Sequence, residues 1–170
     1  MSEANNRAIR LSQEGRLDSS IELFLNLLNQ NPNDPIVNYN LALVYIKKGY
    51  YKNAIPLLIK SVEIDPNDEN LNQLGNCYIN RGELDLAKET LLRATKEFGS
   101  SDSENSLGVC YFLSGDFNSA RAHFKLSVEL DENNDDAWYN LSDTLKELGL
   151  NREAKKAYKK FIDIGKRDEV

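Results

Sequence analysis

Five glycines recur at a nearly constant spacing and constrain this chain more than any other feature. They are Gly15, Gly49, Gly82, Gly115 and Gly149, so successive glycines lie 34, 33, 33 and 34 residues apart. A helix that stops and doubles back commonly ends in a left-handed residue, a conformation that glycine adopts without steric cost. The spacing therefore predicts a helix-turn-helix hairpin around each glycine, repeated in tandem.

Small and bulky residues repeat on either side of these glycines. The first helix of each expected hairpin carries one small residue at a fixed place: Ala8, Ala42, Gly75, Gly108 and Ser142. The second helix carries another small residue: Ser20, Ala54, Ala87, Ala120 and Ala154. A bulky residue follows four positions later: Phe24, Leu58, Leu91, Phe124 and Tyr158. We expect the small residues to let the two helices approach closely and the bulky residue to fill the remaining space.

This pattern resembles the tetratricopeptide repeat, a unit of about 34 residues with an L-G-x2-Y run, an A-x3-F pair and a terminal proline. The segment from Asn40 to Asn67 matches best, and Pro66 closes it. The resemblance covers essentially the whole chain and implies an all-α, right-handed α-solenoid of about ten helices. It implies a single array over 1–170, with repeats at 1–34, 35–67, 68–100, 101–134 and 135–168.

The charge balance argues against two classes of partner. The chain has 21 basic and 27 acidic residues, for a formal net charge of −6. General binders of nucleic acid or of anionic membranes need a basic surface. No run approaches the roughly 20 apolar residues of a membrane span, and the first residues contain no apolar secretion core. We therefore expect a cytoplasmic protein with neither a nucleic-acid nor a membrane partner.

Signatures of catalysis are missing from the sequence. His123 is the sole histidine, and we expect it on the surface or partly packed rather than in an active site. Aspartates and glutamates are plentiful and are expected on helix exteriors and caps. Cys77 and Cys110 occupy the same place in adjacent repeats and are expected to be small core residues, not a redox pair or metal ligands. The sequence indicates no enzyme, no cofactor and no metal.

Members of this family use the first helix of each repeat to line a concave surface. The resemblance implies that the following residues form such a peptide-binding groove here: Tyr39, Asn40, Leu43, Asn72, Gln73, Asn76, Asn105, Val109, Phe112, Tyr139, Asn140 and Asp143. Amide side chains both donate and accept hydrogen bonds without net charge, and aromatic rings offer flat apolar area. Asparagine is common throughout this chain, however, so composition alone is a second explanation for its presence there.

One known type of partner does not fit these positions. Chaperone cofactors of this family bind acidic C-terminal tails through a clamp of lysine, arginine and asparagine. In each possible alignment of the clamp with this chain, an acid stands in a place that needs a cation: Glu69, Asp102 or Asp136. We do not expect this chain to bind an acidic chaperone tail.

The last expected helix has two features that bear on partners. It carries a stripe of lysines that is either a patch for an acidic partner or a solvated face offset by Glu153 and Asp163: Lys155, Lys156, Lys159 and Lys160. Phe161 stands where inner repeats have small residues. One expectation is that a second copy of the chain or further residues cover the Phe161 ring, and a second copy would make a homo-oligomer through the C-terminal helix. The alternative is that the ring folds back onto the fifth repeat.

The function expected from these observations is a non-catalytic protein–protein interaction scaffold. It would bind an extended peptide or partner segment in its concave, asparagine-rich groove. Two alternatives remain. The chain is a substrate-recruiting module of a larger enzyme or regulator, or it is a self-assembling structural scaffold.

Overall fold

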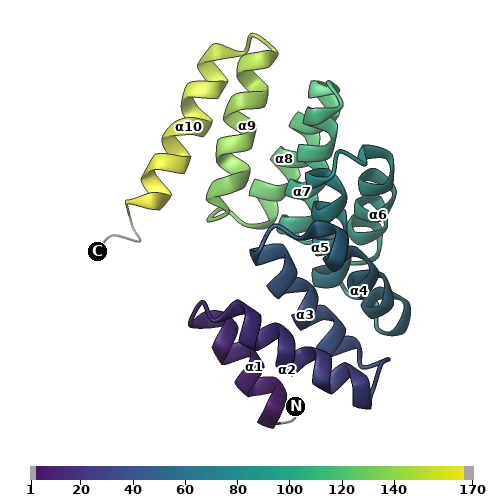
Figure 1. Cartoon of the computed structure of the whole chain (residues 1–170). Helices are drawn as coiled ribbons and strands as arrows, with labels where there is room; N and C mark the ends of the chain where they lie inside the picture. Colours follow the sequence, from purple (N-terminus) through teal and green to yellow (C-terminus); the bar gives the residue numbers. More distant parts are fainter. Residues whose placement is uncertain (1–2, 167–170) are drawn as a thin grey trace. The chain divides into compact units, whose positions relative to one another are not determined.

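The computed structural model describes residues 3–166, and over these residues it contains ten helices and no strand (Figure 1). The helices are α1 (Glu3–Gln13), α2 (Leu17–Gln30), α3 (Pro35–Lys47), α4 (Tyr51–Ile64), α5 (Asp68–Asn80), α6 (Leu84–Glu97), α7 (Ser101–Leu113), α8 (Phe117–Leu130), α9 (Asp135–Glu147) and α10 (Asn151–Gly165). The odd-numbered helices are the first helix of each repeat, and we call them A helices. The even-numbered ones are B helices.

The chain divides between Gly82 and Glu83 into two compact units. In the first unit α1 packs on α2, α2 on α3, α3 on α4 and α4 on α5; in the second, α6 to α10 pack in the same successive way. A helices of neighbouring repeats also meet, because α1 contacts α3 and α7 contacts α9. Each unit therefore has a face built from A helices. The single array over 1–170 stays a prediction.

The recurring glycines end the A helices as predicted. All five have φ between +74° and +79°. At Gly49 the backbone N–H donates to the carbonyl of Ile46 at 2.8 Å, and the N–H of Tyr50 donates to the carbonyl of Tyr45 at 2.8 Å. These bonds satisfy carbonyls that the end of α3 would otherwise leave unpaired. The turn is thus closed by its own backbone.

The small residues lie where the A and B helices cross. Ala42 and Ala54 are fully buried, and Leu58 fills the space beside them, also fully buried. Where serine replaces alanine, its hydroxyl donates to the carbonyl of the facing small residue. Ser20 Oγ donates to Ala8 O at 2.8 Å, and Ser142 Oγ donates to Ala154 O at 3.1 Å.

The expected packing of Tyr158 is wrong. The bulky residues of the four earlier repeats are buried, whereas Tyr158 is 43% exposed. No helix follows α10 within the described residues to cover this ring. Tyr158 lies beside Phe161, with ring centroids 5.8 Å apart, and Lys146 Nζ lies 5.6 Å from the Tyr158 ring centroid.

Both cysteines are core residues, as predicted. Cys77 and Cys110 are each 1% exposed and carry free thiols. Cys110 Sγ donates to the carbonyl oxygen of Leu84 at 3.4 Å. Burial raises the pKa of the Cys77 thiol to about 11 and also raises the pKa of Cys110. Within residues 3–166 no group of three histidine, cysteine or acidic side chains is placed to hold a metal ion.

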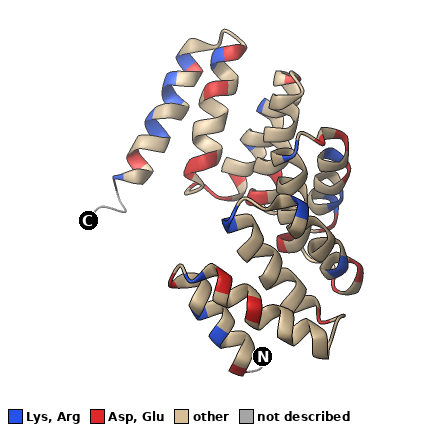
Figure 2. Cartoon of the chain, viewed as in Figure 1, with Lys and Arg blue, Asp and Glu red and all other residues tan. Residues whose placement is uncertain are grey.

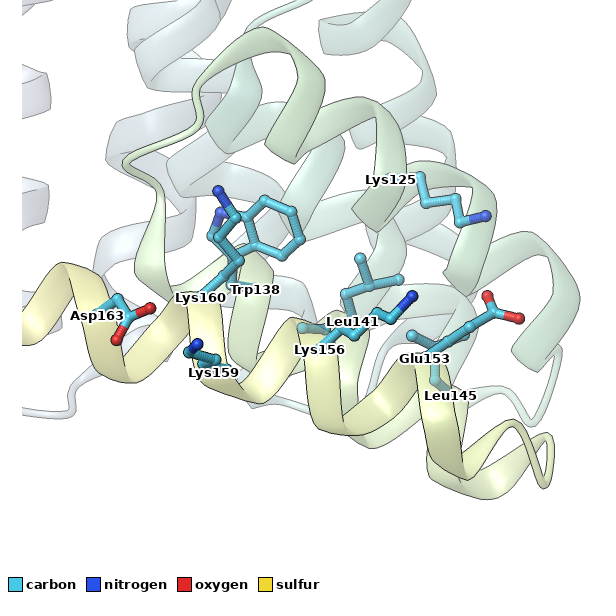
Figure 3. A pocket seen from close by; sticks show the side chains of 10 residues that line it. Lys125, Trp138, Leu141, Leu145, Glu153, Lys156, Lys159, Lys160 and Asp163 are labelled. Atoms are coloured by element: carbon cyan, nitrogen blue, oxygen red, sulfur yellow. The ribbon is translucent and has the colours of Figure 1, made fainter.

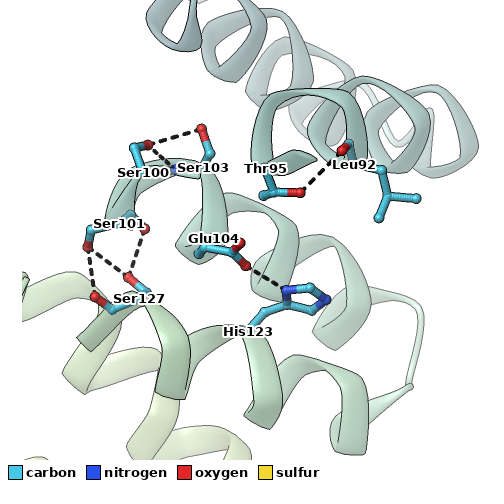
Figure 4. A network of polar contacts seen from close by, with 8 residues as sticks. All are labelled: Leu92, Thr95, Ser100, Ser101, Ser103, Glu104, His123 and Ser127. Carbon is cyan, nitrogen blue, oxygen red and sulfur yellow. Dashed lines mark hydrogen bonds and ion pairs between the residues drawn. The ribbon is translucent and has the colours of Figure 1, made fainter. Parts of the chain in front are cut away.

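Glu104 corrects the expectation that the acids lie on helix exteriors and caps. It is only 5% exposed, and its Oε2 lies 2.7 Å from Nδ1 of His123, which joins α7 to α8 (Figure 4). The His123 ring stacks on Tyr111 at 5.2 Å between centroids, and Lys88 Nζ lies 4.5 Å from the Tyr111 centroid. His123 is thus partly packed, as predicted, but its partner was not foreseen. This contact fixes α7 against α8, and α7 carries several of the expected groove residues.

Gly108→Ala should destabilise the second unit. A Cβ at this position would lie 2.6 Å from Cε1 of Phe124, and the Phe124 ring is 1% exposed and has little room to move. Overpacking of this kind costs about 1–3 kcal/mol. In urea unfolding, adding Phe124→Leu should recover part of the loss. Gly165→Ala is the control, since nothing lies within 4 Å of its added Cβ. Equal stability of the Gly108 and Gly165 variants would contradict the packing described here.

His123→Ala should lower the free energy of unfolding by about 1–3 kcal/mol, because it leaves the buried Glu104 carboxylate without its hydrogen-bond partner. Combining it with Glu104→Gln should cost less than the two changes added together, since the charge that needed a partner is gone. Lys125→Ala on the exposed side of α8 is the control and should change stability by less than about 0.5 kcal/mol. A His123→Ala variant as stable as this control would count against a structural role for the pair.

Both thiols should resist iodoacetamide at pH 8 while the protein is folded. Thiolate is the reactive form, and burial holds the pKa of Cys77 at about 11 and raises that of Cys110. Mass spectrometry should show no adduct in native buffer and two adducts in urea. Asn118→Cys supplies an exposed thiol on α8 as the reactive control. Rapid labelling of the native parent protein would show that the thiols are accessible.

Candidate functional site

The A-helix face of the first unit is hollowed beside α3. The hollow has a volume of about 400 Å³, and we call it the Tyr39 hollow. Its lining comes from α1, α3, the end of α4 and the start of α5: Ile9, Pro35, Ile36, Tyr39, Asn40, Leu43, Ser61, Asp65, Asn67 and Glu69. The structure thus brings together the three expected groove residues of α3, namely Tyr39, Asn40 and Leu43.

Tyr39 links the lining of α3 to α5. Its hydroxyl is hydrogen-bonded to the Glu69 carboxylate. Burial first, and then the hydrogen bond and the charge of Glu69, raise the pKa of Tyr39 well above its ordinary value. Tyr39 therefore stays a neutral donor at any physiological pH, and its ring stays in place as an apolar wall of the hollow.

Asparagines pair across neighbouring A helices in both units. Asn40 Nδ2 donates to Asn5 Oδ1 at 3.4 Å between α3 and α1. Asn140 Nδ2 donates to Asn105 Oδ1 at 3.0 Å between α9 and α7. Both pairs are separated by 35 residues. Each bond uses one N–H of the donor and leaves its carbonyl oxygen open to a further partner.

The second unit gathers four expected groove residues around a smaller cavity of about 70 Å³. It is lined by Val109, Phe112, Asn140 and Asp143, with the buried ring of Phe124 behind them. Asp143 Oδ1 accepts from Lys146 Nζ at 2.7 Å, so its charge is offset locally. The cavity is therefore an apolar recess bordered by the Asn140 amide and by the Asp143 carboxylate, which is ion-paired with Lys146.

Other expected groove residues lie outside these hollows. Asn72, Gln73 and Asn76 of α5 do not line the Tyr39 hollow. Asn72 is only 9% exposed and accepts from Asn76 at 3.5 Å along the same helix. Tyr139 is 43% exposed, and its ring meets that of Phe161 edge to face, with centroids 5.3 Å apart. Phe161 therefore folds back onto its own repeat, and a homo-oligomer through α10 stays a prediction.

Several lining residues were not foreseen from the sequence. Ser61, Asp65 and Asn67 reach the Tyr39 hollow from the end of α4 and the connection to α5. The family pattern assigns the groove to A helices, so it carries no signal for a B-helix end or a loop. Among these three residues, only Asn67 has a local sequence signal: it lies directly before α5, and its side chain caps that helix.

The Tyr39 hollow is acidic. Asp65 and Glu69 lie in its lining, and no lysine or arginine does. By contrast, lysines mark much of α10, where Figure 2 shows blue bands along the helix. The two surfaces would therefore attract ligands of different charge.

Within residues 3–166, no helix is both long enough and apolar enough to span a bilayer.

The fold has close counterparts among solved structures. The crystal structure of MamA superposes with a TM-score of 0.83 at 22% identity and covers 99% of this chain and 98% of its own. The structure of YrrB, described as a TPR protein with an unusual peptide-binding site, has a TM-score of 0.73 at 26% identity and covers 95% of this chain and 84% of its own. These likenesses show what the chain resembles in fold. No curated protein matches the sequence.

Family models match nearly the full length of the chain. A model described as TPR repeat matches residues 8–49. Two models described as tetratricopeptide repeat match 36–68 with 135–164, and 72–137. Together with the ten helices, these matches confirm the expected all-α solenoid class. The chain belongs to the tetratricopeptide repeat family and has the architecture of a protein-interaction scaffold.

Proposed function

We propose that this protein is a non-catalytic scaffold that binds an extended peptide segment of a partner on its A-helix faces. The observation that carries the proposal is the Tyr39 hollow. It combines an aromatic wall, aliphatic side chains and amide groups in about 400 Å³. Ligand sites of this kind bury apolar groups and fix their orientation with a few polar ones.

Hydrogen-bonding capacity supports a peptide as the ligand. A peptide backbone offers alternating hydrogen-bond donors and acceptors, and an asparagine side chain can bind both kinds of group. Asn40 and Asn140 each donate one hydrogen bond to an asparagine on the neighbouring A helix, so the orientation of both side chains is set before a ligand binds. Such preorganisation reduces the entropy lost on binding. YrrB, a protein of similar fold, is described as having a peptide-binding site.

The charge of the hollow favours a neutral or basic peptide. Asp65 and Glu69 have no cation beside them in the lining, and a peptide carboxylate would be repelled there. This agrees with the absence of a clamp for acidic chaperone tails. Of the two carboxylates in this lining, that of Glu69 is already hydrogen-bonded to the Tyr39 hydroxyl, and we assign the surface binding and no catalytic step. We expect no cofactor and no nucleic-acid partner.

Peptides selected for binding to this protein should bind more weakly when residues of the Tyr39 hollow are substituted. We would select from a displayed library of random 12-residue peptides and measure binding by fluorescence polarisation. Asn40→Ala should weaken binding about 2- to 10-fold, since a net hydrogen bond contributes about 0.5–1.5 kcal/mol. Tyr39→Ala should weaken it further, because the aromatic wall is lost. Selected peptides should be neutral or basic.

Asn118→Ala is the matched control, because this asparagine is exposed on the B helix α8. It should leave affinity unchanged, and circular dichroism should show native helicity in all variants. Peptides that bind the Tyr39 and Asn40 variants as tightly as the parent would place the peptide site elsewhere.

A further inference from the structure

A second hollow, larger than the Tyr39 hollow, lies on the second unit among α8, α9 and α10. Its volume is about 460 Å³, within the range of about 300–1,000 Å³ typical of ligand sites. The apolar part of its lining, which we call the floor, consists of Trp138, Leu141, Leu145 and Ala157, and Figure 3 shows the side chains of the first three. We call this hollow the Trp138 pocket. It shares no residue with the Tyr39 hollow, so its role is independent of the function proposed above.

The ring of Trp138 is held in a fixed orientation. Its Nε1–H donates to the carbonyl oxygen of Glu132 at 3.0 Å, which satisfies its one polar group. Lys160 Nζ lies 5.9 Å from the ring centroid, and Figure 3 shows this side chain beside the ring. Leu141 and Leu145 beside it are at most 4% exposed. The half-buried Trp138 ring is therefore the main part of this apolar platform that a ligand can reach.

Lysines surround this platform. Lys125 comes from α8, and Lys156, Lys159 and Lys160 come from α10. All four are exposed. Within residues 3–166 none of them lies within the 4.0 Å of a carboxylate that would make an ion pair. Their charges are therefore available to a ligand.

The local charge differs in sign from that of the whole chain. Among the described residues, the lining contains four lysines and the two acids Glu153 and Asp163, so their formal charges sum to +2. The chain as a whole carries −6. A long polyanion such as nucleic acid would meet repulsion from the rest of the surface. A short anionic segment would experience mainly the lysines.

These observations define the ligand by its chemistry. An apolar side chain can rest on the half-buried Trp138 ring, where burial of apolar area stabilises it. Carboxylates flanking that side chain can reach the lysine ammonium groups and form charge-assisted hydrogen bonds. We propose that the Trp138 pocket binds a short acidic segment of a partner protein, with one apolar residue anchored on Trp138 and acidic residues on either side.

The single tryptophan makes the pocket directly observable, because all indole fluorescence of this protein comes from Trp138. The 170-residue chain would be titrated with pentapeptides of the form Asp-Glu-X-Glu-Asp, in which X is leucine, isoleucine, phenylalanine or methionine. At least one should shift Trp138 emission saturably. The same peptides with alanine at X, or with lysine in place of the acids, should bind at least 10-fold more weakly.

Charge reversal separates a specific pocket from general attraction. Lys156→Glu combined with Lys160→Glu should weaken binding at least 10-fold. Lys155→Glu combined with Lys166→Glu changes the net charge equally at exposed residues outside the pocket and should weaken binding less than about twofold. Equal losses in the two double variants would overturn the proposal, as would an unchanged Trp138 emission with every peptide. Tighter binding of single-stranded DNA than of the acidic peptides would also overturn it.

Discussion

The close crossing of each A helix with its B helix is the contact on which the rest of the fold depends. Ala42 of α3, Ala54 of α4 and Leu58 of α4 are fully buried, and the equivalent small residues of the first and last repeats are in direct contact, as Ser20 with Ala8 and Ser142 with Ala154. Helices that approach this closely leave little room for even one added carbon atom, as the position of Gly108 against Phe124 shows. Because the same crossing recurs in each repeat, the A helices of one unit come to lie side by side and expose a common face.

Features that repeat along the chain could be predicted from the sequence, because repetition separates them from chance. The glycine spacing located the turns, and the small and bulky positions located the crossings. The burial of Cys77 and Cys110 followed from their equivalent places in adjacent repeats. The one crossing prediction that was wrong, at Tyr158, concerns the last repeat, where no described helix supplies the covering surface that inner repeats receive from their neighbours.

Contacts that occur only once could not be predicted in this way. Glu104 and His123 lie 19 residues apart and belong to no repeated position, so nothing in the pattern pairs them. The Trp138 pocket is likewise a local property: Leu141, Leu145 and Ala157 are buried core positions, and only the helix arrangement places the half-buried Trp138 beside the lysines of α10. Of the predicted groove residues, Tyr39, Asn40 and Leu43 line the Tyr39 hollow, but the pattern had no information on the end of α4 that completes the hollow.

The spacing of neighbouring A helices has a consequence for the conformation of the peptide that we propose as ligand. The hydrogen bond between Asn40 and Asn5 joins α3 to α1, and the axes of packed helices lie about 8–10 Å apart. A polyproline II helix advances about 9.3 Å in its three-residue turn and so offers the same face to each successive helix. A β-strand also advances about 10 Å in three residues, but its side chains alternate, so successive helices would meet opposite faces. The spacing of packed helices thus matches the pitch of a left-handed polyproline helix.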